Sequence, residues 1–171
     1  MDIARFFIAL PIPAKTRMLV AQALARQERT IVHTSVPEES WHITLVFLGA
    51  VEDWQRTLAK ISKPLPSHFV PTVTITHLGQ GKNRKQLWAY VQATNVLLRA
   101  RTVLAQRAGR NEDRPFIPHV RVAELDGQSV TIGVADTRIL TSFRVREACV
   151  YRSDLLPDGA MYTKVGVIPF T

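Results

Sequence analysis

The sequence has very little cysteine: Cys149 is the single thiol among 171 residues. One thiol cannot form an internal disulfide and is too few for a thiolate zinc site, which excludes a disulfide-stapled scaffold and a zinc finger. Cys149 stands between alanine and valine in an apolar segment. We therefore expect a buried structural thiol rather than a nucleophile.

Long apolar runs are also lacking. No segment approaches the roughly 20 apolar residues that a membrane-spanning helix needs. The apolar stretch at residues 6–10 resembles the start of a secretory signal, but two prolines and two basic residues follow it within residues 11–17. We therefore expect a soluble cytoplasmic protein that makes no membrane contact.

Acidic residues are outnumbered by basic ones, 14 against 22, which gives a formal net charge of +8. Such an excess favours a polyanionic partner, either nucleic acid or a phosphorylated small molecule. A solubilising surface without any partner would have the same charge, so the charge alone does not decide between them. The hydrophobic fraction of 46% is that of a folded globular domain.

The segment from Trp41 to Gly49 is predicted to be a strand that presents one polar pair. Residues two apart on a strand share a face, so His42 and Thr44 point to the same side. The opposite, buried face is expected to hold Trp41, Ile43, Leu45 and Phe47. An imidazole beside a hydroxyl makes up half of a proton-transfer site.

A second strand of the same kind is predicted at residues 118–123, where His119 and Arg121 share a face. Two imidazoles titrate near neutral pH, so one can activate water while the other protonates the leaving oxygen of a phosphodiester. Thr44 and Arg121 can stabilise the charged phosphoryl oxygens, and this chemistry requires no metal. The two strands together predict a phosphodiester-cleaving site.

The rest of the chain is predicted to alternate short strands with helices. The apolar face of the first helix is assigned to Ala14, Met18, Ala21 and Ala25. Helices are expected at residues 14–28, 52–61 and from 94 or 95 to Gly109; strands are expected at 3–10, 70–78, 87–91, a weak 130–134, 141–151 and 161–167; residues 30–40 read as a polar connection. This order predicts α+β layers in two similar halves.

These motifs resemble the 2H phosphoesterases and, within them, the RNA 2′,3′-cyclic phosphodiesterases, also called 2′-5′ RNA ligase-like proteins. The resemblance rests on residues 5–10, 42–49, 114–120 and 151–153 and on Tyr162, and it spans essentially the whole chain. It implies a bilobal α+β fold in which two antiparallel sheets face a central cleft and helices pack outside. Residues 1–171 would form a single domain of two pseudo-symmetric halves.

The resemblance also implies a reaction, the hydrolysis of RNA 2′,3′-cyclic phosphate ends to 2′-phosphate without a metal or other cofactor. His42 would be the proton donor and His119 the acceptor. The partner would be RNA with a cyclic phosphate end, bound by a monomer that needs no obligate protein partner. Arg121 departs from the family, which has threonine or serine there. Either its guanidinium takes over phosphate stabilisation, which we favour, or it points away and weakens this half of the site.

Further RNA contacts are expected close to the segments that carry the resemblance, at Arg114, Phe116, Tyr151 and Arg152. The basic turn at residues 82–85 is interpreted either as a guide for an RNA strand or, equally well or better, as a solvated hairpin tip. His33, His68 and His77 are expected in surface or turn positions. Three other functions stay open. They are 2′-5′ RNA ligation, cleavage of 2′-5′ linked or small cyclic phosphoesters, and RNA binding by a catalytically impaired module.

Overall fold

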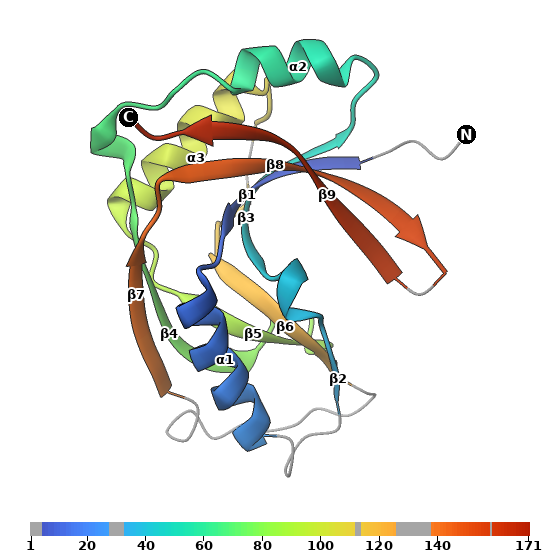
Figure 1. The fold of residues 1–171 in the computed structure, drawn as a ribbon, viewed down its shortest axis with the longest axis vertical. Coiled ribbons are helices and arrows are strands. Elements are labelled where there is room, and N and C mark those ends of the chain that lie inside the picture. Colours follow the sequence, from blue (N-terminus) through green and yellow to red (C-terminus); the bar gives the residue numbers. More distant parts are fainter. Residues whose placement is uncertain (1–4, 28–32, 112–113, 126–137, 158) are drawn as a thin grey trace.

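The computed structural model describes residues 5–27, 33–111, 114–125, 138–157 and 159–171. Within them the elements follow in the order β1 (Arg5–Pro11), α1 (Ala14–Gln27), β2 (His33–Ser35), β3 (His42–Ala50), α2 (Trp54–Ile61), β4 (Thr72–Gln80), β5 (Gln86–Val91), α3 (Asn95–Arg107), β6 (His119–Leu125), β7 (Arg138–Arg144), β8 (Glu147–Leu156) and β9 (Gly159–Pro169) (Figure 1). The predicted α+β class is confirmed.

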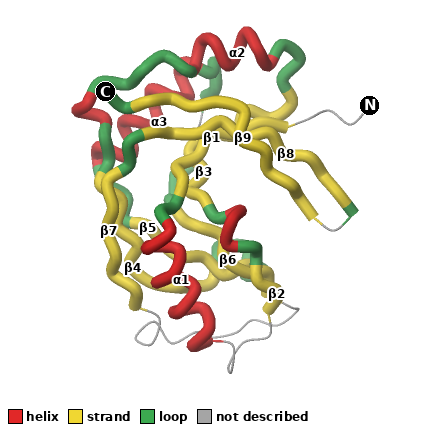
Figure 2. The backbone as a smooth tube through the Cα atoms, viewed as in Figure 1, coloured by secondary structure: helices red, strands yellow, loops and turns green. Residues whose placement is uncertain are grey.

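The strands form one strongly curled antiparallel sheet, whose order is β7-β4-β5-β6-β3-β1-β8-β9 with β2 paired to β6 (Figure 2). The two sheets expected from the sequence are thus continuous. They are joined at β3 and β6 through one register pair, Ile43 opposite Val120. The two histidine strands are therefore neighbours at the junction, and each belongs to a different half of the sheet.

Helix α1 forms where the sequence predicts it, but its buried face is different. Met18 is 51% exposed, whereas the branched side chains of Val20 and Leu24 are buried beside Thr16, Ala23 and Gln27. The larger aliphatic side chains gain more from burial than alanines do, so they decide which face packs inward. None of the helices in the described residues is both long enough and apolar enough to cross a membrane.

Helix α3 has the end signals that the sequence predicts. The Thr94 hydroxyl accepts a hydrogen bond from the Leu97 amide at 3.3 Å, and Gly109 follows the helix with a φ of +64°. The buried residues are Leu97, Ala100, Leu104 and Ala105. This stripe places α3 beside β3, on the outer side of the sheet (Figure 1).

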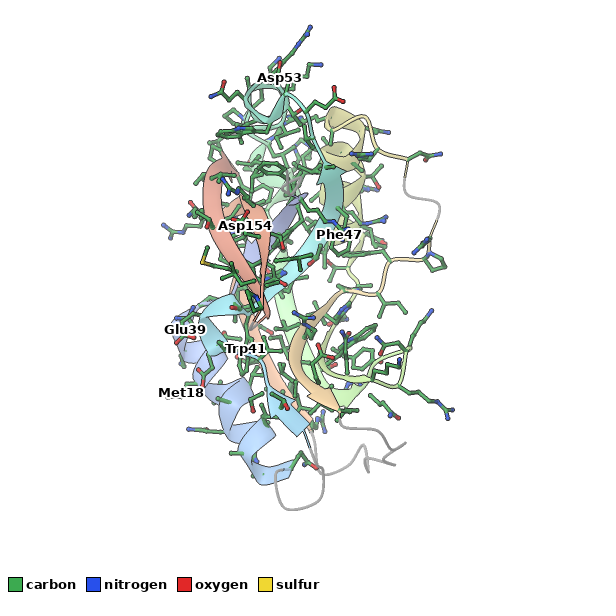
Figure 3. The ribbon with its side chains drawn as sticks, turned by 90° about the vertical axis from the view of Figure 1, so that its right-hand side faces the viewer. Met18, Glu39, Trp41, Phe47, Asp53 and Asp154 are labelled. Atoms are coloured by element: carbon green, nitrogen blue, oxygen red, sulfur yellow. The ribbon has the colours of Figure 1, made fainter. Side chains whose placement is uncertain are left out.

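Strand β3 contains a bulge that reverses its alternation. In its pairing with β1, Ala9 lies opposite Thr44 while Ile8 lies opposite Val46, so Leu45 is an extra residue in the ladder. Beyond the bulge the inward and outward faces are exchanged, and the Phe47 side chain is 68% exposed (Figure 3). The prediction that Phe47 points into the core is wrong, because strict alternation does not hold across a bulge.

The single strand expected at residues 141–151 is in fact two strands. The chain leaves the sheet between them, where Val145 is buried and its amide donates to the Pro71 carbonyl at 3.1 Å. Strand β7 pairs with β4 at one end of the sheet, and β8 pairs with β1 in the other half (Figure 1). The connection predicted at residues 30–40 includes the short strand β2, and the weak strand expected at 130–134 lies outside the described residues.

Candidate active site

The junction between the two halves of the sheet brings together the four side chains that the motifs predict. Ile43 and Val120 face each other and are buried, so their chain neighbours point to the opposite face. The antiparallel register sets His42 beside Arg121 and Thr44 beside His119. All four side chains line one hollow of about 490 Å³.

Both imidazoles are held by the same kind of hydrogen bond. The Nδ1 atom of His42 lies 2.6 Å from the Ser40 carbonyl oxygen, and that of His119 lies 2.7 Å from the Ile117 carbonyl oxygen. A carbonyl oxygen only accepts, so each Nδ1 carries a hydrogen. Each Nε2 is then the atom that takes up or releases a proton, which suits both side chains for acid and base chemistry.

His42 is enclosed by aromatic rings from three strands. Its ring centroid lies 4.8 Å from Phe7 of β1, 5.2 Å from Tyr162 of β9 and 6.0 Å from Tyr151 of β8. Burial lowers the pKa of His42 from 6.5 to about 4, although the hydrogen bond to the Ser40 carbonyl opposes this effect. The positive charge of Arg121 contributes to this lowering of the pKa.

His119 stacks on a single ring, the indole of Trp88, with centroids 3.6 Å apart and planes 11° from parallel. Burial also lowers the pKa of His119, the Ile117 carbonyl opposes the change, and the charge of Arg121 adds to it. Both imidazoles therefore favour the neutral form before a ligand arrives. A bound phosphate anion would raise both pKa values again.

Arg121 points into the cleft and spans the two halves of the sheet. Its Nη1 lies 3.1 Å from Oε1 of Glu124, and its Nη2 donates to the Tyr162 hydroxyl at 3.2 Å. The Arg121 side chain remains 38% exposed, so other N–H groups of its guanidinium can still donate hydrogen bonds to a ligand. The side chain of Arg121 therefore faces the cleft, as the alternation from His119 predicts.

A hydrogen-bond chain connects Arg121 to the ring beneath the second imidazole. Oε1 of Glu124 also accepts from Nε2 of Gln86 at 3.3 Å, and Oε1 of Gln86 accepts from Nε1 of Trp88 at 3.0 Å. The sequence reasoning did not find these residues or the role of Tyr162. The Gln86–Glu124 and Arg121–Tyr162 hydrogen bonds join strands that are distant in the sequence, so no local pattern predicts them.

Two of the predicted RNA contacts, Arg114 and Phe116, lie in a neighbouring hollow of about 730 Å³. This hollow shares Thr44, Phe47 and His119 with the cleft between the histidines. The structure therefore places these predicted contacts beside the histidine site, in a separate but adjoining space.

The other two predicted contacts have different surroundings. Tyr151 lies behind His42 and lines a third hollow of about 300 Å³. Arg152 is paired with Asp154 through Nε and Oδ1, 2.9 Å apart, and it does not line any of the three hollows. No group of three or more His, Cys, Asp or Glu side chains that could hold a metal ion occurs among the described residues.

Comparisons with known proteins place this geometry in context. No family model matches the chain. A curated protein of Escherichia coli (strain K12) named RNA 2′,3′-cyclic phosphodiesterase is 25% identical over 165 residues, which cover 93% of this chain and 92% of that protein.

Two solved structures share the fold. Escherichia coli LigT complexed with 3′-AMP has a TM-score of 0.80 at 24% identity and covers 98% of each chain. TT0787 of Thermus thermophilus has a TM-score of 0.73 at 22% identity and covers 97% of each chain. The fold and the curated relative together confirm the 2H phosphoesterase resemblance predicted from the sequence.

Proposed function

We propose the activity of this chain from the premise that it is a 2H phosphoesterase, the family that its curated relative and its fold both support. The proposed reaction opens an RNA 2′,3′-cyclic phosphate end to a 2′-phosphate. The observation that carries this proposal is the matched pair of imidazoles, each with Nδ1 bound to a carbonyl and both lining one hollow with Thr44 and Arg121.

The proposed steps follow the assignment that the family resemblance implies. Nε2 of His119 takes a proton from water, and the water oxygen bonds to phosphorus. The P–O3′ bond breaks on the opposite side, and Nε2 of His42 gives its proton to O3′. The Thr44 hydroxyl and the Arg121 guanidinium stabilise the negative charge that builds on the phosphoryl oxygens. The product has a free 3′-hydroxyl and a 2′-phosphate.

The protonation state of the pair is set by the bound phosphate. The mechanism needs one imidazole charged and one neutral, whereas burial and Arg121 favour the neutral form of both in the free protein. A phosphodiester anion between the rings stabilises a single added proton and opposes a second, because two charged rings repel each other. Substrate binding and correct protonation are thus coupled.

RNA is the proposed substrate because the site lies on a basic chain with a formal net charge of +8. The cleft of a single copy holds both imidazoles, the Thr44 hydroxyl and the Arg121 guanidinium. We also propose that residues 1–171 act as a monomer of two pseudo-symmetric halves. Sedimentation at assay concentration tests the monomer directly, and a dimer that is required for activity would contradict it.

The decisive assay uses a short RNA that ends in a 2′,3′-cyclic phosphate, in the presence of EDTA. We expect the parent to form the 2′-phosphate, and His42→Ala and His119→Ala each to lose about 10²- to 10⁴-fold in rate. His68→Ala, at an exposed histidine, is the control. If the parent does not hydrolyse this RNA, or if both variants keep the parent rate, the proposed function is wrong.

A further inference from the structure

A second hollow adjoins the cleft on the side of α3, and most of its lining takes no part in the proposed acid and base chemistry. It occupies about 730 Å³, against about 490 Å³ for the cleft between the histidines. The two spaces meet at Thr44, Phe47 and His119. A ligand that fills the cleft can therefore continue into this hollow, which we call the α3 groove.

The α3 groove has a basic lining. Its described lining residues include Lys82, Arg101, Arg110 and Arg114, with no aspartate or glutamate among them. The side chains of Arg101 and Arg110 are fixed in the wall, because each donates to a main-chain carbonyl of β3. Lys82 and Arg114 are exposed at the rim. Such a groove attracts a chain of phosphates.

An aromatic ring stands where the cleft and the α3 groove meet. The bulge in β3 turns Phe47 outward, so that its side chain is 68% exposed although its neighbours Val46 and Leu48 are buried. Among the described residues its ring has one aromatic contact, with Phe7, at 6.4 Å between centroids. An exposed ring between a phosphate site and a basic groove is suited to stacking a base.

The lining of the groove includes a second aromatic ring, that of Phe116. The guanidinium of Arg101 lies over the Phe116 ring, 4.7 Å from its centroid. This contact fixes a flat cation over the face of the ring in the wall of the groove. Positive charge and aromatic rings in one groove are the features by which proteins hold single-stranded nucleic acid without reading its sequence.

We propose that the α3 groove binds the nucleotides that precede the cyclic end, with a base on Phe47 and a phosphodiester between Lys82 and Arg114. The substrate is then an oligonucleotide rather than a cyclic mononucleotide, which would occupy the cleft alone. The inference rests on the proposed function for the identity of the end group, but the groove itself is assigned from its charge, its rings and its continuity with the cleft.

The kinetic test compares two substrates, a pentanucleotide with a 2′,3′-cyclic phosphate end and a nucleoside 2′,3′-cyclic phosphate. We expect a higher kcat/KM for the pentanucleotide. Lys82→Ala, Arg114→Ala and Phe47→Ala should each reduce this preference, with Phe47→Ala reducing it by about fivefold or more. Lys85→Ala, in the same turn as Lys82 but outside the groove, should leave the preference unchanged.

The result that would overturn the proposal is equal kcat/KM for both substrates, or a preference that none of the three groove variants reduces. Salt provides a further readout. The affinity for the pentanucleotide should fall with salt in the parent, and the slope should lessen by about 0.7 when one phosphate contact is lost. A slope that is the same in Lys82→Ala and Arg114→Ala as in the parent would count against the groove.

A binding measurement separates this proposal from the proposed function. Its probe is a labelled pentanucleotide that ends in a 2′-phosphate, followed by fluorescence anisotropy, so it requires no turnover. If the parent binds the probe and the groove variants bind it more weakly, the groove is supported even where hydrolysis is absent. If the parent hydrolyses the cyclic end while the groove variants bind and react as the parent does, the proposed function stands and the groove is wrong.

Discussion

The two halves of the site hold their histidines in the same way but surround them differently. His42 and His119 each begin a strand, and each gives its Nδ1 hydrogen to the carbonyl two residues earlier. Aromatic rings from three strands enclose His42, whereas one indole supports His119. The first half offers the hydroxyl of Thr44, and the second offers the guanidinium of Arg121.

The comparison shows that tautomer and environment are set by different parts of the fold. The main chain of each strand fixes which nitrogen carries the hydrogen, and this is the same in both halves. Side-chain contacts from neighbouring strands influence the pKa of each imidazole, and these contacts differ between the two halves. Similar backbones therefore present two imidazoles in different surroundings, which suits the proposed acid and base pair.

The largest expected effect comes from a substrate that needs no acid. If sulfur replaces the 3′ leaving oxygen of the cyclic phosphate, the leaving group departs without a proton because a thiol is far more acidic than an alcohol. His42→Ala should then recover most of its loss of about 10²- to 10⁴-fold, while His119→Ala should not. Rates for both substrates with both variants provide the measurement. Rescue of His119→Ala instead would reverse the two roles.

The next effect concerns the residue that makes the two halves differ. Arg121→Ala should lower kcat by about 10²- to 10³-fold, because a donor to the charged phosphoryl oxygens is lost. Arg121→Thr gives the second half a hydroxyl like that of the first, so it should restore part of the loss. Arg99→Ala, at an exposed position of α3, serves as the control. An Arg121→Thr variant that is more active than the parent would disprove the phosphate-stabilising role.

A third effect concerns the pH dependence of stability that the burial of His42 causes. The pKa of His42 is lowered to about 4 in the folded protein, so between pH 6.5 and about 4 the unfolded chain takes up a proton that the folded chain does not. Stability should fall across this window as the pH falls, by at most about 3 kcal/mol from this group. Urea unfolding of the parent and of His42→Phe measures it. The same pH slope in both proteins would contradict the assignment.

The smallest expected effect concerns Glu124, whose carboxylate pairs with the guanidinium of Arg121. Glu124→Gln removes a negative charge but keeps an acceptor, so we expect a loss below about tenfold in kcat/KM. The uncompensated charge of Arg121 should lower the pKa values of both imidazoles further and move the acid limb of the pH profile to lower pH. Glu147→Gln, whose carboxylate pairs with Lys164, is the matched control. A lower rate with an unchanged pH profile would indicate a structural role only.

Much of the fold could be predicted from the sequence because strands and helices leave local patterns. The alternation around His42 and His119 predicts two strands with polar pairs, and Thr94 and Gly109 mark the ends of α3. The bulge in β3 could not be predicted. The extra residue leaves no mark in the sequence pattern, yet it reverses which side chains point inward beyond it. Phe47 is the residue most affected.

Other parts of the site depend on contacts that no local pattern carries. Residues 141–151 contain no proline or glycine, so nothing in the sequence marks the break between β7 and β8. Trp88 of β5 reaches His119, and Tyr162 of β9 reaches His42 and Arg121, each from another strand. Their positions follow from strand order and register, which alternation within a single strand does not determine.

The strand order also bears on how the protein is made. Strands β1 and β3 can pair early in synthesis, but the other edge of β1 waits for β8, and β9 pairs with β8. Tyr162 on β9 completes the enclosure of His42 and gives Arg121 its second contact. A nascent chain that has emerged only as far as β7 therefore contains both histidines but lacks these late contacts. Because such long-range pairings form slowly, we expect the cleft between the histidines to be among the last parts of the molecule to mature on the ribosome.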